Sequence, residues 1–266
     1  MMFRFCSAAL SFAMAQAIVC AGPQSKTAQN KFIDESRTGQ VPASSPKSAT
    51  IVTPEMRGDI FMAKKMFREA AEAYKEGGST DAVLLNKTGI AYHQMLELAA
   101  AEKYYRLAVK ANPHYAEAIN NLGTIYYARK SYRRALNEYK KALRISPDSA
   151  SMWSNLGTGY FARKDYPHAA ESWQHALQLD PEVFETRSTQ GVLLQERSVD
   201  ERAKFHYFLA KTYAKAGQND RALLYIRKAL EEGFKERKKF EEEPEFAPLK
   251  DLPEFKQILA MEQRVL

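Results

Sequence analysis

The sequence predicts an all-α protein built as a solenoid of helix-turn-helix repeats. Three prolines, Pro113, Pro147 and Pro181, recur at one constant spacing. Small and aromatic residues recur at the same spacing, and a fixed period of roughly 34 residues is typical of repeat architectures. The other five columns are Gly89/Gly123/Gly157, Tyr92/Tyr126/Tyr160, Ala101/Ala135/Ala169, Tyr105/Tyr139/Trp173 and Ala108/Ala142/Ala176.

Each repeat contains two apolar stripes at helical spacing, as residues 116–149 illustrate. The first stripe is Ile119, Leu122, Gly123 and Tyr126, and the second is Tyr132, Ala135, Leu136, Tyr139, Ala142 and Leu143. Pro147 should end the second helix because proline cannot continue the hydrogen-bond ladder. Asp148 and Ser149 are expected to cap the next helix with their side chains.

Residues 150–183 resemble the tetratricopeptide repeat most fully. Residues 116–149 carry Ile119 in the place of the family's Trp, and residues 82–115 carry Leu85 there. The resemblance implies a right-handed α-solenoid that binds partners and has no enzymatic activity. The matching residues of the fullest repeat are Trp153, Leu156, Gly157, Tyr160, Ala169, Trp173, Ala176 and Pro181.

Two weaker repeats flank these three, and an insertion interrupts the array, since Gly157 and its counterpart Ala210 are separated by more than one period. Gly191–Leu194 in this insertion fits a hairpin, a loop or a distorted helix. Phe246, Leu249, Phe255 and Leu259 are expected to seal the last repeat, because terminal repeats need a cap. The predicted order is repeats at 51–81, 82–115, 116–149 and 150–183, an insertion at 184–202, a fifth repeat at 203–236 and a helical cap at 237–266.

The N-terminus has the pattern of a bacterial export signal. Arg4 precedes an uncharged apolar run that ends at Val19, and cleavage after Ala21 would leave a mature periplasmic chain. The alternatives are acylation of Cys20, as in a lipoprotein, and an uncleaved anchor. Residues 1–21 are therefore predicted to be a signal peptide, and the Pro/Ser-rich residues 22–50 a disordered linker.

In the tetratricopeptide family the first helix of each pair lines a concave groove, so the resemblance implies a peptide or protein partner there. Asn121 and Asn155 lie where the family often holds a ligand's backbone, although they could instead bridge adjacent helices. The predicted groove residues are Asn86, Ile90, His93, Gln94, Asn120, Asn121, Thr124, Tyr127, Ser154, Asn155, Thr158, Phe161, Tyr207 and Lys211.

The chain has a net charge of +7, and much of the excess is local. A basic ridge of seven cations between Arg129 and Arg144 contains one acid, Glu138. It is either a solvated outer face or a contact for an acidic partner, as in a structural component of an envelope assembly. Export and the lack of a recognition motif argue against nucleic acid. The ridge is Arg129, Lys130, Arg133, Arg134, Lys140, Lys141 and Arg144.

The sequence predicts neither a metal site nor a cofactor. No two of the five histidines have the i, i+4 spacing of a metalloprotease helix. Nucleophile-elbow, phosphate-loop and dinucleotide patterns are also missing from the sequence. These observations favour a binding protein over an enzyme.

Overall fold

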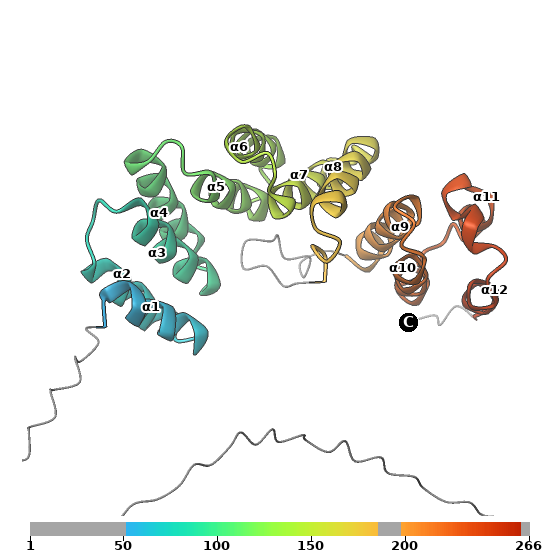
Figure 1. The fold of residues 1–266 in the computed structure, drawn as a ribbon, viewed down its shortest axis with the longest axis horizontal. Helices are drawn as coiled ribbons and strands as arrows, with labels where there is room; N and C mark the ends of the chain where they lie inside the picture. The colour runs from blue at the N-terminus through green and yellow to red at the C-terminus, as the bar shows by residue number, and fades with distance from the viewer. Residues whose placement is uncertain (1–51, 186–197, 262–266) are drawn as a thin grey trace, which may run out of the picture. The chain divides into compact units, whose positions relative to one another are not determined.

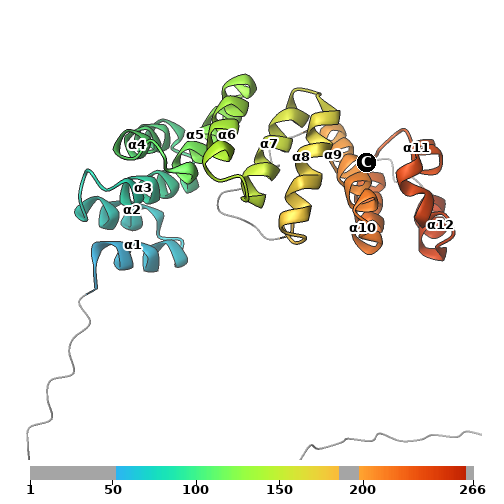
Figure 2. The same cartoon turned by 45° about the horizontal axis from the view of Figure 1, so that its top comes forward.

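The computed structural model describes residues 52–185 and 198–261, and all regular structure in these two ranges is helical (Figures 1 and 2). Helices pair in order, and each pair packs against the first helix of the next. The predicted all-α solenoid is confirmed. The pairs are α1 (Pro54–Ala63) with α2 (Phe67–Glu76), α3 (Ala82–Gln94) with α4 (Leu98–Ala111), α5 (Ala116–Ala128) with α6 (Tyr132–Ile145), α7 (Ala150–Ala162) with α8 (Tyr166–Leu179), and α9 (Val199–Lys215) with α10 (Asn219–Glu231).

The three periodic prolines end three helices in the same way. Helices α4, α6 and α8 each stop two residues before the proline. The residue between them leaves the helical region, with φ of −138° at Asn112, −126° at Ser146 and −145° at Asp180. This is expected because the proline ring disfavours helical backbone in the preceding residue.

A left-handed residue makes the turn inside each of the first four pairs. Lys65, Leu96, Lys130 and Lys164 have φ between 58° and 63°. In the fifth pair Gly217 takes this role with φ of 73°. This backbone conformation is strained for a residue that has a Cβ. The packing of the two helices therefore holds these four residues in it.

Helices of one pair approach closely at the periodic glycines. A Cβ on Gly89 would lie 2.6 Å from Cδ1 of Tyr105, and one on Gly123 would lie 2.6 Å from Cε1 of Tyr139. Gly157 faces Trp173 in the same way. The small and aromatic columns of the sequence are therefore the two sides of one repeated contact.

The predicted side-chain cap of α7 is wrong. Ser149 occupies the N-cap position, but it makes no capping hydrogen bond, and Asp148 is exposed. The Ser149 hydroxyl instead lies 3.2 Å from the hydroxyl of Ser151. Side-chain caps form at other helices, where Thr53 and Asp81 accept from backbone N–H groups of α1 and α3.

Helix α9 begins at Val199, four residues before the predicted boundary of the fifth repeat at 203. Ser198 Oγ accepts from the Glu201 N–H at 3.3 Å, and two acids in the first turn favour a helix start there. The predicted signal peptide (1–21), linker (22–50) and most of the insertion, including Gly191–Leu194, lie outside the described residues.

The described chain closes with three short elements, α11 (Lys238–Glu242), the 3₁₀ helix η1 (Pro244–Leu249) and α12 (Pro253–Ala260). Phe246 and Leu249 are fully buried, and Leu259 packs against the same core. Here η1 packs against α9 and α10, and α12 packs against α10. At the other end, α1 leaves Met56 and Ile60 45% and 46% exposed. In the described part of the chain, no helix is both long and apolar enough to cross a membrane.

Candidate functional site

The first helices of neighbouring pairs form one continuous surface. Helix α5 contacts both α3 and α7, as well as its own partner α6. We call this surface the first-helix face. It carries Asn86, Ile90, His93, Gln94, Asn120, Thr124, Tyr127, Ser154 and Thr158 on α3, α5 and α7.

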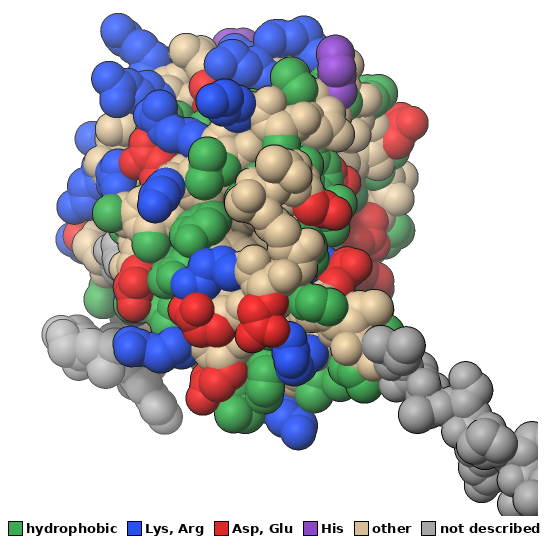
Figure 3. Space-filling view, turned by 90° about the vertical axis from the view of Figure 1, so that its left-hand side faces the viewer, with side chains coloured by type: hydrophobic (Ala, Val, Ile, Leu, Met, Phe, Trp, Pro, Cys, Tyr) green, Lys and Arg blue, Asp and Glu red, His purple; other side chains and the backbone are tan. Residues whose placement is uncertain are grey.

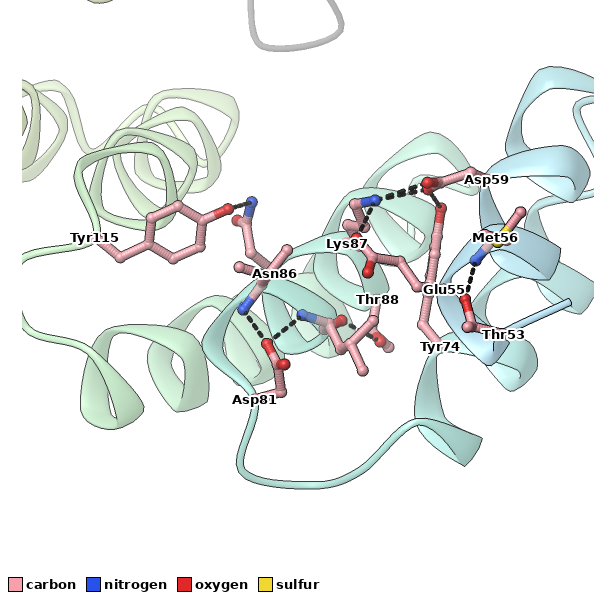
Figure 4. Close-up of polar contacts among 12 residues, drawn as sticks. Thr53, Glu55, Met56, Asp59, Tyr74, Asp81, Asn86, Lys87, Thr88 and Tyr115 are labelled. Atoms are coloured by element: carbon pink, nitrogen blue, oxygen red, sulfur yellow. Dashed lines mark hydrogen bonds and ion pairs between the residues drawn. The ribbon is translucent and has the colours of Figure 1, made fainter. Parts of the chain in front are cut away.

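Asparagines join the first helices of adjacent repeats. Asn121 Nδ2 donates to Asn86 Oδ1 at 3.0 Å, and Asn155 Nδ2 donates to Asn120 Oδ1 at 3.1 Å. All four residues are buried, and Asn86 also donates to Tyr115 at 3.4 Å (Figure 4). These amides bridge adjacent repeats, which is the alternative that the sequence left open for Asn121 and Asn155. They fix the spacing of the first-helix face.

One amide donor of this asparagine network has no hydrogen-bond partner among the described residues. Asn120 is fully buried, and its Nδ2 finds no hydrogen-bond partner within residues 52–185 and 198–261. A buried donor without a partner costs about 1–3 kcal/mol. The first-helix face therefore holds an amide that would gain from an additional acceptor.

The hydroxyl groups of this face bond within their own helices. Thr124 Oγ1 donates to the Asn121 carbonyl at 2.6 Å, and Thr158 Oγ1 donates to the Ser154 carbonyl at 2.9 Å. Both threonines are buried. Their hydroxyl protons are thus already engaged.

The accessible part of the first-helix face is smaller than the predicted set. Gln94 is exposed, and Ile90, His93, Tyr127 and Ser154 are half-buried. Burial lowers the pKa of the His93 imidazole below its ordinary value of 6.5. Near pH 7 this face therefore offers neutral amide, hydroxyl, imidazole and aromatic groups.

Phe161 belongs to the core instead. It is 4% exposed and packs against Tyr166, Trp173, Phe205 and Phe208, with ring centroids 5.5–6.0 Å apart. Phe161 thus packs between the fourth helix pair and α9 of the fifth.

Lys87, beside this face, is neutralised by the first repeat. Its Nζ lies 2.8 Å from carboxylate oxygens of Glu55 and Asp59 (Figure 4). Asp59 also accepts from the Tyr74 hydroxyl at 2.7 Å. Since Lys87 is already paired, it is poorly suited to capture a ligand's C-terminal carboxylate.

The two predicted groove residues of α9 lie against the cap. Lys211 Nζ forms ion pairs with Glu243 at 2.9 Å and Glu245 at 3.3 Å. Tyr207 is 2% exposed and stacks on Phe234 at 4.5 Å between ring centroids. The structure therefore brings these two residues to the cap contact and not to the first-helix face.

All seven cations of the basic ridge are exposed. Arg129 pairs with Glu102, and Lys141 pairs with Glu138 at 2.8 Å. Lys140 Nζ lies 5.2 Å from the centre of the Tyr160 ring. The space-filling view of one face shows lysine and arginine side chains concentrated toward its upper left, with others scattered below (Figure 3).

A hollow adjoins the ridge between α4 and α6, with a volume of about 520 Å³. Its lining includes Arg106, Tyr126 and Asn137, which the sequence analysis did not single out as site residues. Arg106 lies one repeat period before Lys140, so the periodic columns carried a signal for it. The full lining of this basic hollow is Arg106, Tyr126, Arg134, Asn137, Glu138, Lys140, Lys141 and Arg144.

The histidines of α8 make local contacts. His168 Nδ1 lies 2.8 Å from Asp165, and the ring of His175 packs on Trp153 with centroids 4.3 Å apart. Within the described ranges, no three His, Cys, Asp or Glu side chains gather as metal ligands would.

The repeats belong to a known family. Two family models described as "Tetratricopeptide repeat" match residues 84–115, 150–183 and 203–232, and a third, described as "TPR repeat", matches residues 123–158. With the paired helices, these matches make the protein a tetratricopeptide repeat protein. Its fold is that of a scaffold for protein interactions.

Solved structures of similar fold include a crystal structure of MamA, with 21% identity and a TM-score of 0.46 over 66% of this chain and 93% of that one. MamA from Desulfovibrio magneticus RS-1 has 20% identity and a TM-score of 0.46 over 65% and 89%. The first such repeat domain of Spaghetti (RPAP3), solved with an HSP90 peptide, has 22% identity and a TM-score of 0.39 over 41% and 86%. No curated protein matches the sequence.

Proposed function

We propose that the protein is a non-enzymatic scaffold that binds a peptide or protein partner along the first-helix face. The observation that carries the proposal is the continuity of this face, since α5 contacts both α3 and α7. Membership of the tetratricopeptide repeat family supports it.

The residues of the face divide into two roles. The buried asparagine pairs, Asn121 with Asn86 and Asn155 with Asn120, hold the helices in register. The accessible Ile90, Gln94 and Tyr127 would contact the partner. Aromatic and amide side chains suit an extended peptide, because the ring supplies contact area and the amide pairs with main-chain groups.

The test compares crosslinked partners of two triple variants in cells. Ile90→Ala, Gln94→Ala and Tyr127→Ala together should release the partner without unfolding the protein. Matched changes at exposed residues of α4 and α8, Leu107→Ala, Glu171→Ala and Gln178→Ala, should retain it. The same partners on both variants would refute binding at the first-helix face.

Residues 1–21 support a second element of the proposal, export from a bacterial cytoplasm. The apolar run after Arg4 and the small residues around Ala21 are its basis. N-terminal sequencing of the protein from a periplasmic fraction should begin at Gly22. Palmitate labelling that disappears in Cys20→Ser would instead establish the lipoprotein alternative.

The remaining hypothesis, an envelope-assembly component that contacts partners through the basic ridge, stays a prediction.

A further inference from the structure

The basic hollow between α4 and α6 has an unbalanced charge. Five cations line it. Lys141 is paired with Glu138, the one carboxylate of the lining, and Arg106 is paired with Glu102 beside it, both at 2.8 Å. Arg134 and Arg144 have no ion-pair partner among the residues that the structure describes. Like charges so close together repel one another, so an anionic ligand would relieve an unfavourable interaction.

The hollow is preorganised on the α4 side. Arg106 Nε is hydrogen-bonded to Glu102 at 2.9 Å, and its Nη2 donates to the Tyr126 hydroxyl at 2.9 Å. These bonds hold the guanidinium beside the hollow, so less side-chain entropy is lost when an anion binds. Helix α6 supplies the opposite wall.

The cations on α6 are spaced along one side of the helix. Three cations and one amide follow each other at intervals of three or four residues: Arg134, Asn137, Lys141 and Arg144. From Arg134 to Arg144 the helix rises by about 15 Å. An extended chain of roughly five residues spans that length.

We propose that the basic hollow is a second docking site, which binds an extended acidic segment of a protein partner. Carboxylates of alternate residues pair with the arginines and lysines, and the Asn137 amide pairs with the segment's main chain. This site is separate from the first-helix face. The protein would then hold two partners, or two parts of one partner.

A lipid surface fits the hollow less well. Helix α6 carries no exposed large hydrophobic side chain that could enter a bilayer. The cations also surround a hollow of about 520 Å³, whereas a membrane presents a flat surface. A lone phosphate would leave most of the row of charges on α6 unused.

Fluorescence anisotropy of a labelled octaglutamate peptide with the full-length chain tests the proposal. Binding should weaken steeply with added salt, because the contacts are exposed ion pairs. The variant Arg134→Glu, Lys141→Glu and Arg144→Glu should weaken binding by at least about tenfold, since each lost pair contributes a fewfold change. The charge-neutral variant Arg134→Gln, Lys141→Gln and Arg144→Gln covers the case in which charge reversal prevents folding.

The control variant has the same change of net charge elsewhere. Lys204→Glu, Lys215→Glu and Lys238→Glu replace exposed lysines of α9 and α11. Retained binding in this control supports the hollow as the site, and equal loss in both variants overturns it. Binding of tripolyphosphate or of phosphatidylglycerol vesicles, without binding of the peptide, would also overturn the proposal. The first-helix variant should bind the peptide normally, so the two proposals can fail separately.

Discussion

Replacing the equivalent tyrosine of the first three repeats by phenylalanine should give effects of opposite sign. Tyr74, Tyr105 and Tyr139 hold equivalent positions, and their rings are 2%, 1% and 0% exposed. Their hydroxyl groups differ. Tyr74 donates to Asp59 at 2.7 Å, Tyr105 lies 3.5 Å from His93 Nδ1, and Tyr139 Oη has no partner within the described ranges.

Tyr139→Phe should therefore raise the free energy of unfolding by about 1 kcal/mol, because it removes a buried hydroxyl that is desolvated without gaining a hydrogen bond. Tyr74→Phe should lower the free energy of unfolding by about 1 kcal/mol, since it loses a bond to a carboxylate that is partly exposed and hence weaker than a buried one. Tyr105→Phe should change it little, because a contact of 3.5 Å is a weak hydrogen bond.

Urea unfolding followed by circular dichroism measures all three variants. A stability change with an unchanged slope shows as a shift of the midpoint alone. In thermal unfolding, 1 kcal/mol corresponds to about 2–4 °C for an array of this size. If Tyr139→Phe were destabilising by about 1 kcal/mol or more, the hydroxyl would have a partner, and the reasoning would be refuted.

Three further outcomes are expected. Lys211→Met should lower the free energy of unfolding by about 1 kcal/mol, because Glu243 and Glu245 lose their partially buried counter-ion; unchanged proteolysis of the cap in this variant would contradict the role of the pair. Leu96→Gly should raise the free energy of unfolding by roughly 0.5–1 kcal/mol, since Leu96 is 71% exposed and has a φ of 60°; a lower urea midpoint would count against turn strain. Because burial lowers the pKa of His93 below 6.5, its contribution to stability is complete above about pH 6.5 and is lost as the pH falls from there through the folded-state pKa. His93→Gln should flatten that decline in urea midpoints measured from about pH 7.5 to 5, and an equal decline in both proteins would exclude His93 as a source.

Periodicity made the helix pairs predictable. The glycine and aromatic columns meet in the same way in three repeats, and three helices stop two residues before a periodic proline. Capping residues were predicted less well than the helix pairs. Ser149 was expected to cap α7, but its hydroxyl pairs with Ser151 and not with the helix N-terminus.

The site was only partly predictable, for a tertiary reason. Whether Asn121 faces a ligand or Asn86 depends on the rotation between repeats, which no spacing within one repeat reports. Lys211 has the helical position of a groove residue, but the cap returns to cover it. Arg106 joins the basic hollow from a neighbouring repeat, so the run of charge on α6 did not include it.

The two ends of the array differ in how well their outer helices are covered, so unfolding should start at one end and proceed toward the other. Neighbouring pairs support one another, so a solenoid opens most easily where a pair has one neighbour and, among the described residues, no cover. The cap buries Phe246 and Leu249 against the last pair, while Met56 and Ile60 on α1 remain nearly half exposed. Amide hydrogens should consequently exchange fastest in α1 and α2, and progressively more slowly toward α9. A pulling force should likewise unfold α1 and α2 before the pairs nearer to the cap.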